Sequence, residues 1–312
     1  MHAPQTPAGD SKRPQASRRH LLQHLFAGIG SAALGADASA QVRSDATSRA
    51  LGGEAVLLEF PGPIQNQGYR LVQNWDFAST VNTVEKLRDE FFTRYIYKGG
   101  RLDTLNDEWQ RYRDNDNHVF EDGALSLVAR APTEVASGLI ESGMLRSKWS
   151  GQYGYFECRM KVPGGRGLWP AFWLNPQDKI WPPEIDIVEI VNNGRDTTRD
   201  SFHFVHPGVP DDRRPATYSR LRTNHGYHPG FDYKDDFHAF AVEWTADRVR
   251  HFVDDELVVD RPFRWLHANG SDAGAAHVLV NLAVGGKWPG PPGRREEFPA
   301  KLQLKHIRVW QR

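Results

Sequence analysis

The sequence predicts an all-β protein, a sandwich of two sheets in a single domain over residues 54–312. Throughout this range, short apolar runs alternate with stretches of Gly, Pro, Asn and Asp, which is typical of many short strands joined by turns. Sustained 3.6-residue periodicity, which would indicate helices, is nearly absent. Because no repeat and no linker interrupts the range, we expect the strands to pack as one two-sheet domain.

The first forty residues have the pattern of an export signal. SRRH at 17–20 precedes a modestly apolar run at 25–34, and ASA at 38–40 forms a small-x-small cleavage site. Paired arginines before a weakly apolar run are typical of twin-arginine signals, and the alternative is a disordered basic tail. We expect residues 1–40 to be a signal peptide, 41–53 a polar segment, and the mature protein to be exported to the periplasm or secreted.

Composition excludes some classes of partner. The chain has 39 Lys and Arg against 39 Asp and Glu, so there is no electrostatic reason to expect nucleic acid or an anionic membrane surface. Beyond the signal, no stretch approaches the ~20 apolar residues of a membrane span. The single cysteine, Cys158, excludes an intramolecular disulfide and is expected to be a small buried hydrophobe.

Alternating apolar and polar residues predict the strands along the chain. Turn residues at 121–123 precede the first clear alternation, and the turn 253–256 joins two strands into a hairpin. Only residues 84–96 have a helical pattern, and we expect them to form either a helix or a loop with one helical turn. The predicted strands span 124–129, 154–162, 237–244, 248–253, 277–283 and 303–311.

The stretch WPPEIDIVEIVNNG at 181–194 carries three carboxylates in six residues. In a flat strand Glu184 and Asp186 would share one face, and Glu189 would lie on the other face with Ile and Val. Burying an unpaired carboxylate costs several kcal/mol, whereas one extra residue only kinks a strand. We therefore predict a bulge at Ile187–Val188 that places all three acids on one face.

Such a pair of glutamates suits the hydrolysis of glycosidic bonds. Retaining glycosidases need two carboxyl groups about 5–5.5 Å apart, one to attack the anomeric carbon and one to protonate the leaving oxygen, whereas inverting enzymes leave room for a water. Two carboxylates this close do not ionise together readily, so one is expected to keep its proton as the acid. Asp186, between Glu184 and Glu189, can hydrogen-bond the nucleophile. The motif alone also fits a solvated acidic face or a calcium site.

Aromatic and imidazole groups flank the acidic strand in the sequence. Trp169 and Trp173 share one face of a predicted strand, either as a platform for sugar rings or as core. Downstream, the stretch SFHFVH at 201–206 would bring His203 beside the acids on the next strand, unless this histidine is structural.

At this point the sequence resembles glycoside hydrolase family 16, in the branch of laminarinases, agarases and carrageenases. The resemblance runs in order from Leu71 to the C-terminus and begins with LVQNWDF and FEDGALSLVAR. Its longest blocks are SGLIESGMLRSKWSGQYGYFECRMKVPGGRGLWPAFWL, EIDIVE, DFHAFAVEWTADRVRHFVDDELV and NLAVGGKWPG. The spacing ExDxxE is the family's bulged form of the motif.

This resemblance implies a β-jelly-roll of two antiparallel sheets with an open concave cleft, retaining hydrolysis of a β-linked polysaccharide, and no cofactor in catalysis. By matching position, Glu184 resembles the nucleophile, Asp186 the assisting residue and Glu189 the acid/base. The residues that match the family's cleft aromatics and cleft histidine are Trp169, Trp173, Trp288 and His203.

One departure from the family pattern means that the sequence does not identify the sugar of the substrate. Laminarinases usually have Ser-Gly or Cys-Gly before the first Glu, where this chain has Pro182-Pro183. Our hypothesis is an endo-acting hydrolase of a β-1,3- or β-1,3-1,4-glucan. The alternatives are a transglycosylase, a hydrolase of a galactan or exopolysaccharide, and a glycan-binding protein without activity.

The expected activity also indicates the binding partner. A polysaccharide is the expected partner and a monomer the expected state. Some family members carry a structural calcium on the convex side, and no ligand cluster in this sequence identifies one.

Overall fold

The predicted jelly-roll sandwich of two antiparallel sheets is confirmed by a computed structural model of the protein, which describes residues 60–132, 138–209, 223–294 and 297–312. The signal and polar segments predicted over 1–53 lie outside the described residues. Strand pairs within both large sheets are antiparallel.

The larger sheet has eight strands among the described residues. Strand β1 (Arg70–Asp76) pairs with β17 beside the main path of the sheet. Across the sheet the order is β15 (Glu256–Pro262), β14 (Arg248–Val253), β13 (His238–Trp244), β8 (Gly154–Lys161), β17 (Ala300–Gln311), β5 (Ala124–Ala129) and β4 (His118–Glu121).

The smaller sheet has seven strands in the part of the chain that the structure describes. Their order is β12 (Thr223–Tyr227), β11 (Ser201–His206), β10 (Glu184–Glu189), β9 (Leu168–Pro176), β16 (Ala276–Val284), β7 (Met144–Gly151) and β2 (Phe91–Phe92). A separate parallel pair and three short helices complete the described elements. They are β3 (Gln110–Tyr112), β6 (Ile140–Ser142), η1 (Gly62–Ile64), α1 (Val84–Glu90) and α2 (Tyr97–Gly100).

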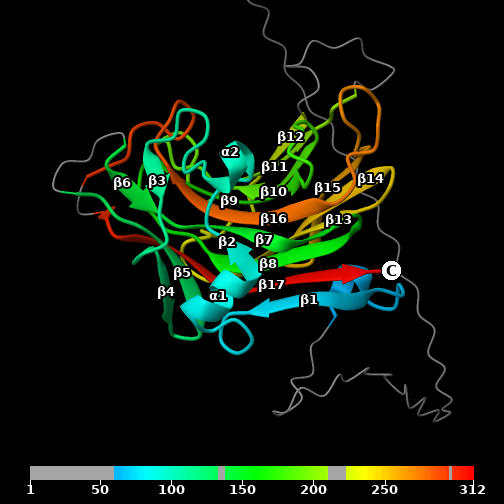
Figure 1. Ribbon diagram of the computed structural model, residues 1–312, viewed down its shortest axis with the longest axis horizontal. Coiled ribbons are helices and arrows are strands. Elements are labelled where there is room, and N and C mark those ends of the chain that lie inside the picture. Colours follow the sequence, from blue (N-terminus) through cyan, green and yellow to red (C-terminus); the bar gives the residue numbers. More distant parts are fainter. Residues whose placement is uncertain (1–59, 133–137, 210–222, 295–296) are drawn as a thin grey trace, which may run out of the picture. The chain divides into compact units, whose positions relative to one another are not determined.

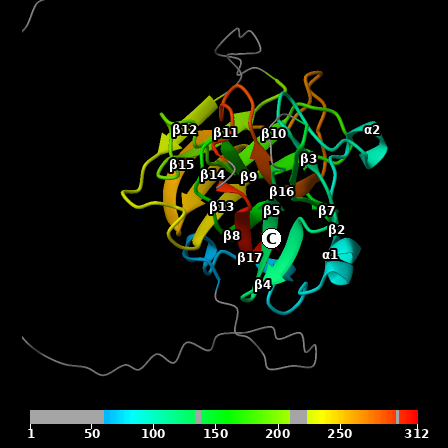
Figure 2. The same cartoon turned by 90° about the vertical axis from the view of Figure 1, so that its left-hand side faces the viewer.

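The main hydrophobic core fills the space between the two sheets. Figure 1 shows β16 of the smaller sheet above β8 and β17 of the larger one, and Figure 2 gives the perpendicular view. Phe156 of β8 and Val280 of β16 are fully buried in this core. Cys158 lies there too, and burial raises the pKa of its thiol, so it packs as an unreactive hydrophobe, as predicted.

Local sequence explains the turns and the first helix. Asp254 and Asp255, between β14 and β15, have φ of 47° and 67°, the left-handed pair that a type I′ hairpin turn needs. Thr83 caps α1, because its Oγ1 accepts a hydrogen bond from the Lys86 backbone N at 3.3 Å. The helix ends at Glu90, short of the 84–96 range, because Phe91 pairs with β7. No helix of the described residues is long and apolar enough to cross a membrane.

The predicted bulge is present in β10. The register of β10 shifts between Asp186 and Val188 against β9, and between Asp186 and Glu189 against β11. Ile187 and Val188 are both fully buried in the main core. The bulge therefore lies at Ile187–Val188, as the spacing of the three acids predicted.

Candidate active site

Three carboxylates of β10 lie on the side of the smaller sheet that faces away from the larger sheet. Ile185 and Val188 are fully buried in the core between the sheets, so the bulge turns Glu184, Asp186 and Glu189 to the opposite side. Figure 1 shows β16 of this sheet curved, with its hollow side away from β17. We call this side of the smaller sheet the acidic face.

Strand pairing brings side chains of β9 and β11 onto the acidic face. Residues directly opposed in antiparallel strands share a face. On β11, His206 lies opposite Glu184, Phe204 opposite Asp186 and Phe202 opposite Glu189; on β9, Trp173 lies opposite Asp186 and Ala171 opposite Glu189.

An imidazole bridges two of the acids. Nε2 of His206 lies 3.1 Å from Oδ2 of Asp186 and 3.5 Å from Oε1 of Glu184. The ring therefore links the two carboxylates and orients them. Sequence reasoning missed His206, because only the register of β11 against β10 places it opposite Glu184.

His203 does not lie on the acidic face, so its prediction as a cleft histidine is wrong. Its side chain is 0% exposed, and its ring lies 5.5 Å from the ring of His251 in the larger sheet. Its Nδ1 is 2.6 Å from the Ile187 carbonyl oxygen and its Nε2 is 3.1 Å from Ser201 Oγ. Alternate residues of β11 point to opposite sides, and His203 has the parity of the core.

Two predicted tryptophans surround Glu189. The Nε1 of Trp169 donates a hydrogen bond of 2.9 Å to Oε1 of Glu189. The ring of Trp288 meets Trp169 edge-on at 5.4 Å and Phe202 at 5.3 Å. The structure thus brings Trp169 and Trp288 together beside the predicted acid/base.

Trp173 lies on the acidic face but does not form the open platform that was predicted. It is 6% exposed, and its Nε1 donates to Oδ1 of Asn281 at 2.7 Å. Tyr95 and Tyr112 pack over it in a second, smaller hydrophobic cluster. Because this cluster covers the indole, Trp173 supports the floor of the site.

Two further aromatic residues, not predicted, approach the Glu184 end. Asn175 Nδ2 donates to the Tyr97 hydroxyl at 3.2 Å. Burial raises the pKa of Tyr97, and the charge of Glu184 raises it further, so the phenol stays protonated. Trp181 is 41% exposed and its ring lies 5.8 Å from that of His206. The sequence signal for Trp181 was its place in WPPE, just before Glu184.

Donor atoms of Glu184, Asp186 and His206 lie within 4.8 Å of one another, close enough to share a metal ion. An imidazole nitrogen with carboxylate oxygens suits a transition metal better than calcium, which takes about six to eight oxygen ligands. Within the described ranges no second group of three His, Cys, Asp or Glu side chains is this close. No side-chain ligand set for a structural calcium is therefore identified there.

Comparison with known proteins gives a family match over most of the described domain. The model of "Glycosyl hydrolases family 16" matches residues 106–296, which include all three acids. A laminarinase catalytic domain from Thermotoga maritima has a similar structure, with a TM-score of 0.62 and 27% identity, over 78% of this chain and 98% of that one.

Relatives of different names match at similar identity. A beta-glucanase of Rhodothermus marinus is 34% identical over 182 residues, 53% of this chain and 59% of the relative. A kappa-carrageenase of Pseudoalteromonas carrageenovora is 29% identical over 217 residues, 64% of this chain and 52% of the relative. The chain thus spans little more than half the length of these two relatives.

Proposed function

Because the chain belongs to glycoside hydrolase family 16, we propose that it is an endo-acting, retaining hydrolase of a β-linked glucan. The observation that carries the proposal is the bulge in β10, which turns Glu184, Asp186 and Glu189 to one face. A regular strand of this sequence would turn Glu189 away from Glu184.

The proposed reaction has two steps. Glu184 attacks the anomeric carbon while Glu189 protonates the leaving oxygen, which gives a covalent glycosyl-enzyme. Glu189, now a carboxylate, then takes a proton from a water that attacks the same carbon and releases Glu184. Two inversions retain the configuration of the sugar.

Neighbouring groups support these roles. His206 lies within 3.5 Å of Glu184 and 3.1 Å of Asp186 and helps to orient the nucleophile. The hydrogen bond from Trp169 fixes Glu189, which must hold a proton in one step and accept one in the next.

A glucan is the preferred substrate class in this proposal. The supporting relatives are the beta-glucanase at 34% identity and the laminarinase domain at 27%. A galactan is the second candidate, supported by the kappa-carrageenase at 29% identity and by Pro182-Pro183 in place of the usual laminarinase residues.

Export fits this activity, because a polysaccharide is encountered outside the cell. We propose that the twin-arginine-like stretch at 17–20 directs export and that cleavage follows residue 40.

A panel of defined β-glucans and galactans, read by mass spectrometry, tests the function. We expect the wild type to release mixed short oligomers from a β-1,3- or β-1,3-1,4-glucan, and Glu184→Gln to lose more than about 10³-fold of this activity. Glu256→Gln, an exposed glutamate on β15, is the matched control and should keep full activity. Activity of Glu184→Gln at the wild-type level would overturn the proposal, and products longer than the substrate would indicate a transglycosylase.

A further inference from the structure

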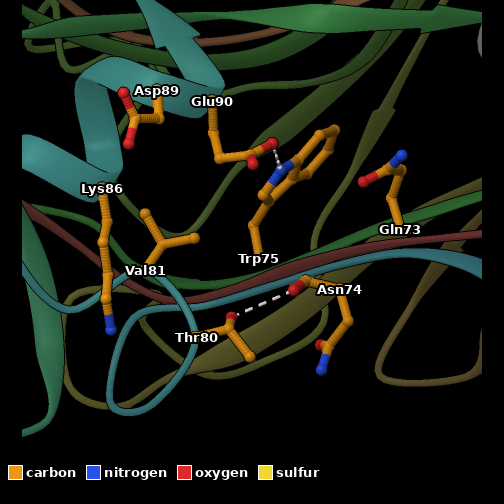
Figure 3. A pocket seen from close by; sticks show the side chains of 8 residues that line it. All are labelled: Gln73, Asn74, Trp75, Thr80, Val81, Lys86, Asp89 and Glu90. Atoms are coloured by element: carbon orange, nitrogen blue, oxygen red, sulfur yellow. Dashed lines mark hydrogen bonds between the residues drawn. The ribbon is translucent and has the colours of Figure 1, made fainter. Parts of the chain in front are cut away.

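Two cavities in the described part of the chain lie away from the acidic face. The smaller, of about 250 Å³, lies beside α1; Figure 3 shows it, with the hydrogen bond of 2.9 Å from Trp75 Nε1 to Glu90 Oε2. Pockets for small ligands usually have about 300–1,000 Å³. The smaller cavity falls below this range, whereas the larger, of about 440 Å³, falls within it.

Segments far apart in the sequence build the larger cavity. They are the residue before β1, the turn between β7 and β8, the end of β13 and the end of β17. Its walls include Tyr69, Gln152, Tyr153, Trp244, Gln311 and Arg312. The acids of β10 are not among its lining residues, so it is distinct from the candidate active site.

The ring of Tyr153 is held in a fixed orientation at this cavity. Its φ of 61° is in the left-handed region, which is uncommon for a bulky residue and costs free energy. Gln311 Nε2 clamps the turn by donating to the carbonyl oxygens of Gln152 at 3.0 Å and Tyr153 at 2.9 Å. Behind it, Trp244 meets the Tyr153 ring edge-on at 5.1 Å. Tyr153 is only partly buried, so this oriented ring is open to a ligand.

Polar groups beside the ring are oriented as well. Gln152 Nε2 donates to Asp272 Oδ1 at 2.7 Å, which orients its amide. The Arg312 guanidinium, also in the lining, lies 4.9 Å above the Tyr69 ring. The cavity therefore combines a flat ring with amide and guanidinium groups.

Glu243, a buried acid in contact with this wall, is compensated. Glu243 accepts a hydrogen bond of 2.8 Å from the Tyr69 hydroxyl and forms ion pairs with Arg250 and Arg312. Glu243 therefore presents no uncompensated negative charge to the cavity, and the hydroxyl, amide and guanidinium groups of the lining suit a ligand rich in hydroxyl groups. A sugar has this chemistry, since its C–H face packs on an aromatic ring while its hydroxyls bond to amides.

We propose that the larger cavity is a second glycan-binding site, which holds a strand of the polysaccharide that the acidic face cleaves. This inference rests on the proposed function. A strand bound at Tyr153 raises the effective concentration of the polymer at the acids. The site should therefore lower KM for long chains and leave short oligosaccharides unaffected.

Binding of a soluble β-1,3-glucan by full-length Glu184→Gln protein tests the site without cleavage. Tyr153→Asn removes the ring and keeps a residue that tolerates the left-handed region. We expect this change, added to Glu184→Gln, to raise Kd for the polymer by about 3- to 10-fold. Phe231→Asn, at a 38% exposed aromatic outside both sites, is the matched control and should leave Kd unchanged.

A second comparison uses the active enzyme. Tyr153→Asn alone should raise KM for the polymer and keep kcat/KM of the folded enzyme for an aryl oligosaccharide within about twofold. Equal Kd with and without Tyr153, or an equal loss on the short substrate, would overturn the second site. Failure of the proposed function would look different, because the wild type would then hydrolyse no glycan.

Discussion

Glu184, Asp186 and Glu189 share a face but not an environment. Glu184 and Asp186 lie beside the imidazole of His206, whereas Glu189 accepts a hydrogen bond from the indole of Trp169. Groups of the same type thus have different neighbours, as the different roles in the proposed reaction require. These differences can be tested one residue at a time.

Trp169 should act on the pH dependence of the reaction. Trp169→Phe keeps a ring but removes the donor to Glu189, and a donated hydrogen bond favours the charged carboxylate. The acid must be protonated in the first step, so the basic limb of the kcat/KM profile should move to higher pH. Trp173→Phe, which loses only its bond to Asn281, should leave the limb in place. A limb that moves equally in both variants would contradict this role.

The two histidines of β11 should separate activity from stability. His206→Gln is expected to lower kcat about tenfold, because Glu184 and Asp186 lose the ring that bridges them, with little change in Tm. His203→Gln should lower Tm by roughly 2–10 °C, because the fully buried ring bonds to Ser201, and leave kcat of the folded enzyme nearly unchanged. Measured kcat and Tm for both variants check this, and the reverse pattern would restore the cleft role of His203.

At the scale of the element, the acidic strand shows what sequence can and cannot predict. The bulge was predictable, because burying Glu189 unpaired costs more than one extra residue. Which side of β11 lies on the acidic face was not predictable, because both sides of this strand carry apolar and imidazole groups. Phe202 and His206 lie on one side, and His203 and Val205 lie on the other. Only pairing with β10 decides between them.

The length of β10 between Asp186 and Glu189 should control activity. Inserting one Ala after Val188 places Glu189 four positions after Asp186, so an alternating strand keeps it on the acidic face but moves it further along the strand from Glu184, and kcat/KM should fall by about 10²–10⁴-fold. Deleting Val188 removes the bulge but keeps the acids at alternate positions on one face. The deletion should therefore retain more activity than the insertion, despite losing a buried side chain. Assays of purified, folded variants decide, and an insertion as active as the wild type would contradict the required separation of Glu184 and Glu189.

At the scale of the whole molecule, contacts between distant segments shape the acidic face. Trp173 bonds to Asn281, 108 residues away, and Asn281 bonds to Tyr112, 169 residues away. The alternation within β9 predicted that Trp169 and Trp173 share a face, and pairing with β10 places Trp173 on the side of the acids. It carried no information on Tyr95 and Tyr112, which cover the ring. The local sequence pattern thus predicted the two sheets. The segment that covers Trp173 could be identified only from the tertiary structure.

Glu108 should make the stability of this covering segment depend on pH. Burial raises the pKa of its carboxyl to about 7, although Gln110 Nε2 donates to it at 2.6 Å. The folded chain then binds the proton more tightly than the unfolded chain, so the free energy of unfolding falls as pH rises from about 4.5 to 7. Glu108→Gln should flatten Tm against pH in this window, with Glu256→Gln as the exposed control. Parallel Tm curves for wild type and Glu108→Gln would contradict the assignment.

The facing of Glu184 and Glu189 across one glycosidic bond is tested most directly by chemical rescue with azide, using an activated aryl β-glycoside. In Glu184→Ala, azide should attack from the vacated side and give the α-glycosyl azide. In Glu189→Ala, azide should attack the intermediate on Glu184 from the opposite side and give the β-glycosyl azide. Opposite anomers from the two variants are the expected result, and the same anomer from both, or the reverse assignment, would contradict the account.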